Sequence, residues 1–139
     1  MILFVDDEKR RMENYIMELE ESGYSVKLCT DVDDALYFLT EHSKRIELII
    51  LDIMMPPGKS FNLDDTQMGF RTGIRFYEKI REVNKTLPVI IFTHVADPNI
   101  AEKFYTEKNC WFFRKINLLE FELVEEINNI LNKNEKGKR

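Results

Sequence analysis

Three carboxylates, one hydroxyl group and one ammonium group stand at or near the ends of short apolar segments of the sequence. They belong to Asp6, Asp7, Asp52, Thr93 and Lys115. The apolar segments are Ile2–Val5, Leu48–Leu51, Val89–Phe92 and Trp111–Phe113. If the segments are parallel strands of an open sheet, the five side chains meet at the edge where the strands end, which is where such sheets bind ligands.

The three aspartates would repel one another if they met without a cation. Two carboxylates about 4 Å apart, at an effective dielectric constant near 20, repel by roughly 4 kcal/mol. A bound cation or a proton must therefore accompany them, and Mg²⁺ fits oxygen ligands best. Thr93 and Lys115 would then face the metal with a donor and a positive charge, an arrangement that binds a phosphoryl group. Asp52 is the candidate nucleophile, which would form an acyl phosphate.

The pattern along the chain predicts five strands that alternate with five helices. The four segments above are continuously apolar, as in strands covered on both faces, whereas Tyr24–Cys29 alternates, as in an edge strand. Apolar residues at helical spacing predict helices around Met12–Leu19, Val32–Leu39, Ile74–Ile80, Ile100–Tyr105 and Leu119–Ile130. Gly23 is placed to close the first helix, and Asp97-Pro98 to open the fourth. This order predicts an α/β fold, a doubly wound five-stranded parallel sheet with right-handed crossovers.

The composition is that of one folded domain. A chain of 139 residues is long enough to bury about two-thirds of its unfolded surface. Apolar residues make up 44% of it and charged residues 32%, as is ordinary for a globular protein. The net charge is −5, and segment 133–139 carries +3, leaving −8 on residues 1–132. This negative charge on residues 1–132 disfavours nucleic-acid binding. The two cysteines lack metal-binding spacing, and no segment approaches the roughly 18 apolar residues of a membrane span. We expect a cytoplasmic protein without nucleic-acid or membrane partners, with a basic, disordered tail over 133–139.

Four stretches of the sequence resemble the receiver domain of two-component response regulators, of the single-domain, chemotaxis-receiver-like kind. They are Ile2–Glu8, Leu48–Pro56, Pro88–Thr93 and Phe112–Lys115. The resemblance predicts a receiver domain over residues 1–132, with a flavodoxin-like fold and the strand order 2-1-3-4-5. It implies that a histidine kinase or a phosphotransfer protein passes a phosphoryl group from phosphohistidine to Asp52, as in a phosphorelay.

The resemblance also implies a ligand set for Mg²⁺. Asp52 corresponds to the phosphoacceptor and contributes to the metal site. Asp7 corresponds to the direct acidic ligand, and Asp6 to the ligand that acts largely through water. The backbone carbonyl of Met54 completes the set of protein ligands.

Three further residues correspond to the family's phosphate-binding and switch residues. Lys115 corresponds to the lysine that pairs with the phosphoryl group, Thr93 to the switch hydroxyl and Phe112 to the switch aromatic. Phosphorylation is expected to shift the packing of the face formed by helix 4, strand 5 and helix 5. The protein would then signal through that face to a downstream protein or a second copy of itself, as a phosphoacceptor and not as an enzyme.

Three features depart from the family's pattern. Lys115 is followed by Ile116 where proline is usual, which leaves open whether that peptide bond is cis or trans. His94 stands where a small residue is usual. The connection from residue 53 to 72 is about 20 residues long, beyond the usual length of loops. It is expected to be a disordered surface loop, a lid over Asp52 or an element that docks a partner. Partial packing is favoured by four large apolar residues after Pro57, namely Phe61, Leu63, Met68 and Phe70.

Two other functions stay open at this point. A pseudo-receiver would bind partners without being phosphorylated, and the unusual Ile116 and His94 are compatible with it. A phosphohydrolase would turn over an aspartyl-phosphate. Such haloacid-dehalogenase-type enzymes need a second aspartate two residues after the nucleophile, where this chain has Met54.

Overall fold

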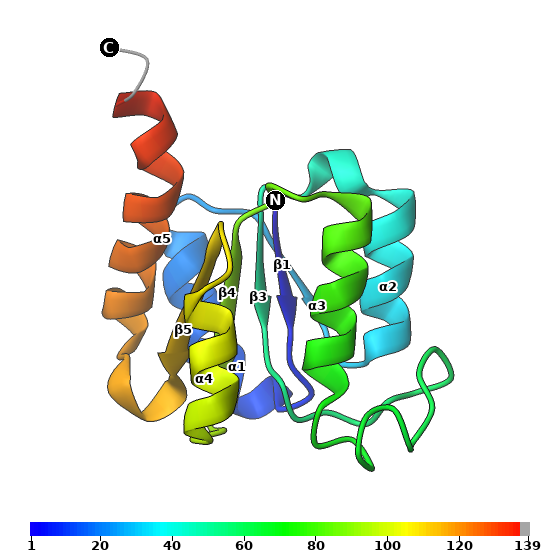
Figure 1. Ribbon diagram of the computed structural model, residues 1–139. Coiled ribbons are helices and arrows are strands. Elements are labelled where there is room, and N and C mark those ends of the chain that lie inside the picture. The colour runs from blue at the N-terminus through cyan, green and yellow to red at the C-terminus, as the bar shows by residue number, and fades with distance from the viewer. Residues whose placement is uncertain (137–139) are drawn as a thin grey trace.

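The computed structural model shows a five-stranded sheet between two layers of helices (Figure 1). It describes the backbone of residues 1–136 and the side chains of residues 1–132. The strands follow the order β2-β1-β3-β4-β5, and each neighbouring pair is parallel. The predicted doubly wound α/β fold with the order 2-1-3-4-5 is therefore confirmed.

The elements alternate along the chain as the apolar pattern predicts. The strands are β1 (Ile2–Val5), β2 (Val26–Cys29), β3 (Leu48–Leu51), β4 (Val89–Thr93) and β5 (Cys110–Arg114). The helices are α1 (Lys9–Glu21), α2 (Val32–Glu41), α3 (Thr72–Val83), α4 (Pro98–Tyr105) and α5 (Glu120–Lys136). Two short 3-10 turns, η1 (Ser43–Arg45) and η2 (Lys115–Asn117), precede β3 and α5. Helix α5 includes residues 133–136 of the predicted tail, whereas residues 137–139 lie outside the described residues.

Local side chains set several helix boundaries. The Asp31 carboxylate accepts a hydrogen bond from the backbone N–H of Asp34 at 2.8 Å and so caps the start of α2. Asp97 caps α4 in the same way, and Pro98 occupies the first turn. Gly23 follows α1 with a φ of 99°, a left-handed value that favours glycine.

Each central strand is buried on both faces. Leu3 and Val5 of β1 pack with α2, α3 and α4, whereas Ile2 and Phe4 pack with α1 and α5. The sheet therefore separates two apolar cores, which explains why the central strands are continuously apolar. At the edge, β2 has only partly buried apolar side chains before Cys29, in agreement with its alternating sequence.

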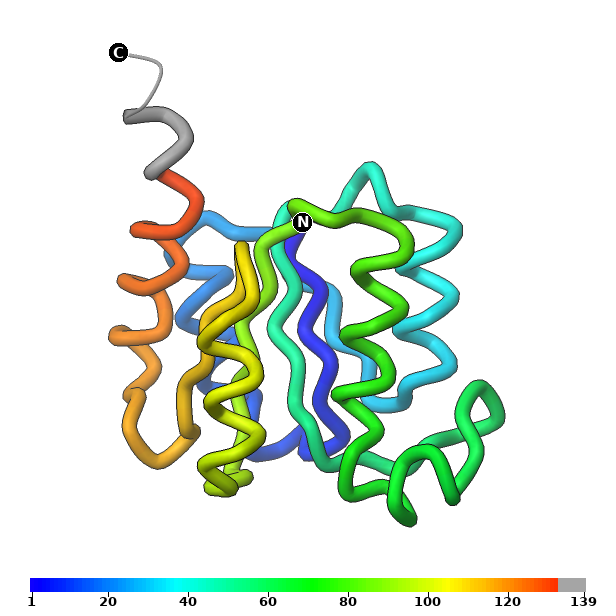
Figure 2. Tube along the Cα trace, in the orientation of Figure 1, coloured from blue at the N-terminus to red at the C-terminus, as the bar shows by residue number. Residues whose placement is uncertain are grey.

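The connection between β3 and α3 is folded into turns and extends past the ends of α2 and α3 (Figures 1 and 2). Its path is tied to α2, because the backbone N–H groups of Lys59 and Ser60 donate to the carboxylate of Asp33. Phe61 packs against the core, which confirms partial packing. The three other large apolar side chains after Pro57, Leu63, Met68 and Phe70, are exposed. This path leads away from α4 and β5 (Figure 1), and whether the connection covers Asp52 or docks a partner stays a prediction.

Candidate functional site

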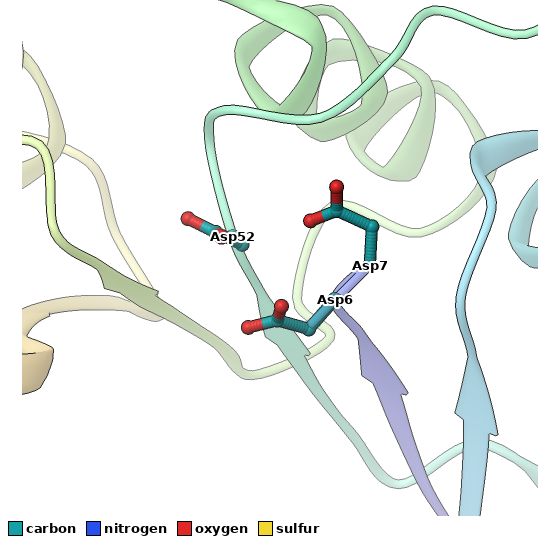
Figure 3. A group of neighbouring side chains, drawn as sticks. All are labelled: Asp6, Asp7 and Asp52. Atoms are coloured by element: carbon teal, nitrogen blue, oxygen red, sulfur yellow. The ribbon is translucent and has the colours of Figure 1, made fainter. Parts of the chain in front are cut away.

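The ends of β1 and β3 bring Asp6, Asp7 and Asp52 together (Figure 3). The two strands pair in register, with Val5 opposite Leu51, so the residues that follow them are neighbours. One carboxylate oxygen from each aspartate lies within 4.8 Å of the other two. The convergence expected from the sequence is therefore present in the fold.

Lys115 lies against two of the three carboxylates. Its Nζ atom is 2.7 Å from Oδ2 of Asp6 and 3.1 Å from Oδ2 of Asp52, and its side chain is 3% exposed. Asp6 and Asp52 are also buried, whereas Asp7 is exposed. When all are ionised, the three carboxylates and one ammonium carry a net charge of −2, which a divalent cation would neutralise.

Burial and the surrounding charges shift the pKa values of Asp6, Asp7 and Lys115. Burial raises the pKa of Asp6, and the nearby charge of Asp52 raises it further. The same two causes raise the pKa of Asp7. Burial alone would lower the pKa of Lys115, but the charges of Asp52 and Asp6 together more than offset it and raise that pKa. Ionised Asp6 and Asp7 therefore cost folding stability once the pH exceeds their raised pKa values, and a bound cation would relieve that cost.

Backbone groups fix the orientation of the two buried carboxylates. The N–H of Glu8 donates to Oδ1 of Asp6 at 2.9 Å, and the N–H of Ile53 donates to Oδ1 of Asp52 at 2.8 Å. Each carboxylate thus has one oxygen bound by the backbone and the other directed at Lys115. The side chains are held in place before any ligand binds.

Gly73 allows α3 to begin directly against the end of β3. A Cβ atom at this position would lie 2.1 Å from the backbone oxygen of Asp52 and 2.5 Å from Cα of Ile53. The N–H of Gly73 donates to the carbonyl of Ile53 at 2.7 Å, and the hydroxyl of Thr72 donates to the carbonyl of Met55. Helix α3 therefore braces the backbone that carries Asp52. The role of the Met54 carbonyl as a metal ligand stays a prediction.

The predicted switch residues lie on neighbouring strands. Thr93, at the end of β4, is fully buried, and its Oγ1 accepts a hydrogen bond from the N–H of Val95 at 3.2 Å. Phe112 on β5 is buried and stacks on Phe104 with ring centroids 6.2 Å apart. Tyr105 contacts the same ring edge-on at 5.8 Å. Whether these two residues switch stays a prediction.

The turn after β5 contains the peptide bond between Lys115 and Ile116, whose isomer the sequence does not determine. Among the described residues no peptide bond is cis, so the bond between Lys115 and Ile116 is trans. In this conformation Lys115 still reaches both carboxylates. The missing proline therefore does not displace the lysine.

Sequence reasoning missed one side chain near this turn. The hydroxyl of Tyr15, on α1, donates to the carbonyl of Leu118 at 2.6 Å. The helical pattern identified Tyr15 only as a member of an apolar face. No sequence signal indicates a hydrogen bond between residues 103 positions apart.

Known proteins resemble this chain along most of its length. No protein-family model matches it. The transcriptional regulatory protein DltR of Streptococcus agalactiae is 34% identical over 93 residues, which are 66% of this chain and 34% of DltR. The response regulator MprA of Mycolicibacterium vanbaalenii is 32% identical over 102 residues, or 73% and 37% of the two chains. A response regulator receiver domain protein from Clostridium thermocellum superimposes with a TM-score of 0.75 at 25% identity, covering 96% of this chain and 95% of that one. The chain belongs to the response-regulator receiver family.

The receiver spans about a third of the length of the curated relatives it matches. By contrast, it matches almost all of the solved receiver domain. The likeness to two-component response regulators therefore concerns the receiver domain. Among the described residues, no helix is long and apolar enough to cross a membrane.

Proposed function

We propose that this receiver takes a phosphoryl group from phosphohistidine onto Asp52. The observation that supports this most directly is the ammonium of Lys115, 3.1 Å from Asp52, beside two further carboxylates. Positive charge on both sides of a transferred phosphoryl group is what lowers the barrier to its transfer. The donor would be a histidine kinase or a phosphotransfer protein.

Each residue of the site has a part in the transfer. An Oδ atom of Asp52 attacks phosphorus in line, and the phosphorus–nitrogen bond of the donor breaks, its electron pair remaining on the histidine. Lys115 pairs with the phosphoryl oxygens, and the Thr93 hydroxyl donates to one of them. Asp7, Asp6 through water, Asp52 and the Met54 carbonyl would hold Mg²⁺, which when bound supplies positive charge to the phosphoryl oxygens.

The output is a change in binding to other proteins. An added phosphoryl charge would draw Thr93 toward Asp52 and change the packing of Phe112 against Phe104 and Tyr105. That change alters the α4–β5–α5 face, which would bind a downstream protein or a second copy of the chain. The protein acts as a phosphoacceptor and not as a turnover enzyme. Both of its cysteines are free, which supports a cytoplasmic location.

The test is to incubate the protein with acetyl phosphate and Mg²⁺ and to measure its mass over time. The expected result is a lasting mass increase of one phosphoryl group. This increase should be absent when Mg²⁺ is chelated before the donor is added. The absence of any increment would favour a pseudo-receiver. Continuous release of phosphate from an excess of donor would favour a phosphohydrolase.

We expect Asp7→Asn to weaken Mg²⁺ binding about tenfold or more, and Asp6→Asn to weaken it less. Asp6 is already bound by Lys115 and by the N–H of Glu8, whereas the exposed carboxylate of Asp7 is available to a metal. Because partial desolvation and the nearby charge of Asp52 raise the pKa of Asp7, Mg²⁺ binding to the wild type should also weaken as the pH falls through that pKa. Titration calorimetry at several pH values measures both effects. Equal losses in the two variants, or the reverse order, would contradict this ranking.

The phosphorylated protein is expected to lose its phosphoryl group slowly. Hydrolysis requires a water in line with phosphorus, and by likeness to other receivers the side chains two residues after Asp52 and Thr93 would flank that approach. They are Met54, which is 43% exposed, and the partly buried Val95, and neither has a strong hydrogen-bonding group to orient a water. His94 adds an exposed, bulky side chain beside them.

The decay of the isolated phosphoprotein is the measurement. Met54→Asn and His94→Ala should each accelerate it, whereas Met68→Asn, at an exposed methionine in the same connection, should not. Decay of the wild type within seconds would show that water is not excluded. A slower decay in His94→Ala would show that His94 positions the water.

A further inference from the structure

The turn that carries Lys115 is weakly held by its own backbone. Pairing between β4 and β5 ends at Arg114, opposite Thr93, so the sheet fixes Lys115 from one side only. Within η2, the N–H of Leu118 donates to the carbonyl of Lys115 at 3.5 Å, which is long for a hydrogen bond. The side chain of Ile116 is 76% exposed and adds little packing. Besides the ion pairs of Lys115, contacts from other elements must therefore hold this turn in place.

Tyr15 supplies that contact from α1. Its hydroxyl donates to the carbonyl of Leu118 at 2.6 Å. In the part of the chain that the structure describes, this is the one hydrogen bond that joins residues 116–118 to an element outside the connection from β5 to α5. Leu118 itself is buried in the core between the sheet and the α1–α5 layer.

The ring of Tyr15 is fixed in turn by the sheet. It meets the ring of Phe92 edge to face, with centroids 5.1 Å apart and an interplanar angle of 73°. Phe92 is fully buried on β4 and directly precedes Thr93. The packing against Phe92 therefore restricts the position of the Tyr15 ring and of the hydroxyl that contacts Leu118.

We propose that Tyr15 is a positioning residue for phosphoryl transfer and acts through Lys115. Its hydrogen bond holds the end of η2, so that the Lys115 side chain spans Asp6 and Asp52. Ile116 leaves this turn without the fixed φ angle that a proline would give it, and the tether to Tyr15 restricts the turn instead. This inference rests on the proposed function, since the transfer to Asp52 is the reaction that Lys115 serves.

Tyr15→Phe removes the hydroxyl and keeps the ring against Phe92. We expect it to slow phosphorylation by acetyl phosphate about 3- to 10-fold, the value of one net hydrogen bond. Lys115→Ala should slow the reaction more. In the Lys115→Ala background, Tyr15→Phe should have no further effect, because a residue that acts through Lys115 has nothing left to position.

The matched control is Tyr24→Phe. The Tyr24 hydroxyl also hydrogen-bonds toward α5, to the side-chain oxygen of Asn128, but lies outside the connection that carries Lys115. Both variants lose one tyrosine hydroxyl, so a general loss of stability would slow them alike. Only Tyr15→Phe should slow phosphorylation.

A second readout needs neither metal nor phosphodonor. In protein labelled with ¹⁵N-lysine, NMR measures how fast the ammonium protons of Lys115 exchange with water. The buried, doubly ion-paired group should exchange slowly in the wild type and in Tyr24→Phe, and faster in Tyr15→Phe. If the wild type is not phosphorylated, the proposed function fails, but this measurement still tests the tether. The proposal would be overturned if the ammonium protons of Lys115 exchanged equally fast in Tyr15→Phe and the wild type. It would also be overturned if Tyr15→Phe slowed phosphorylation equally in the presence of Lys115 and in the Lys115→Ala background.

Discussion

The Asp52→Asn variant is expected to take up phosphoryl groups from acetyl phosphate at least about a thousandfold more slowly than the wild type. An amide is not a nucleophile toward phosphorus, and no other carboxylate of the site can replace Asp52. Asp6 has one oxygen bound to the N–H of Glu8 and the other to Lys115, and Asp7 is expected to serve the metal. The asparagine oxygen can still accept the hydrogen bond that Asp52 receives from Ile53, so the loop should keep its path.

The measurement is the mass of each protein after incubation with acetyl phosphate and Mg²⁺. Asp64→Asn, which removes an exposed carboxylate from the β3–α3 connection, serves as the control and should be modified like the wild type. Phosphorylation of Asp52→Asn at the wild-type rate would mean that another side chain is the acceptor.

Replacing Gly73 with alanine is expected to lower the free energy of unfolding by about 3 kcal/mol. The added methyl group would meet the backbone oxygen of Asp52 at 2.1 Å and Cα of Ile53 at 2.5 Å. These are backbone atoms, so no side-chain rotation can relieve the overlap, and α3 must move away from β3. The same shift would displace Asp52, so the variant should also be phosphorylated more slowly.

Gly23→Ala separates this overlap from backbone strain. Gly23 has a φ of 99°, but a Cβ atom there would meet nothing within 4 Å. Its substitution should therefore cost only the strain of a left-handed residue, about 1 kcal/mol. Denaturant unfolding of both variants gives the comparison. Equal losses would show that the contact with Asp52 does not explain the need for glycine at position 73.

The sequence predicted strands and helix starts well where they depend on residues close together in the chain. The central strands are buried on both faces and form continuous apolar runs in the sequence, and Asp97-Pro98 opens α4 as predicted. The start of β2 was predicted at Tyr24 but lies at Val26. The N–H of Tyr24 donates to the carbonyl of Leu19, so the chain is still completing the end of α1 at that point.

The meeting of Asp6, Asp7 and Asp52 was predictable because the parallel order places the ends of β1 and β3 side by side. The contacts that support the site were not. Tyr15 binds a backbone carbonyl 103 residues away, and Asp33 binds backbone N–H groups 26 and 27 residues away. Such contacts depend on how layers pack and leave no pattern in the sequence. The length of the β3–α3 connection was evident, but its path past α2 was not.

That path gives the receiver a useful place for a reporter. The turn at residues 62–65 is closed by hydrogen bonds between Asn62 and Asp65, and Arg75 of α3 anchors it by donating to the Asp65 carbonyl. Leu63, at the tip, is exposed. The connection lies across the molecule from the α4–β5–α5 face (Figure 1). A fluorophore attached at residue 63 would therefore leave the α4–β5–α5 face uncovered for downstream partners.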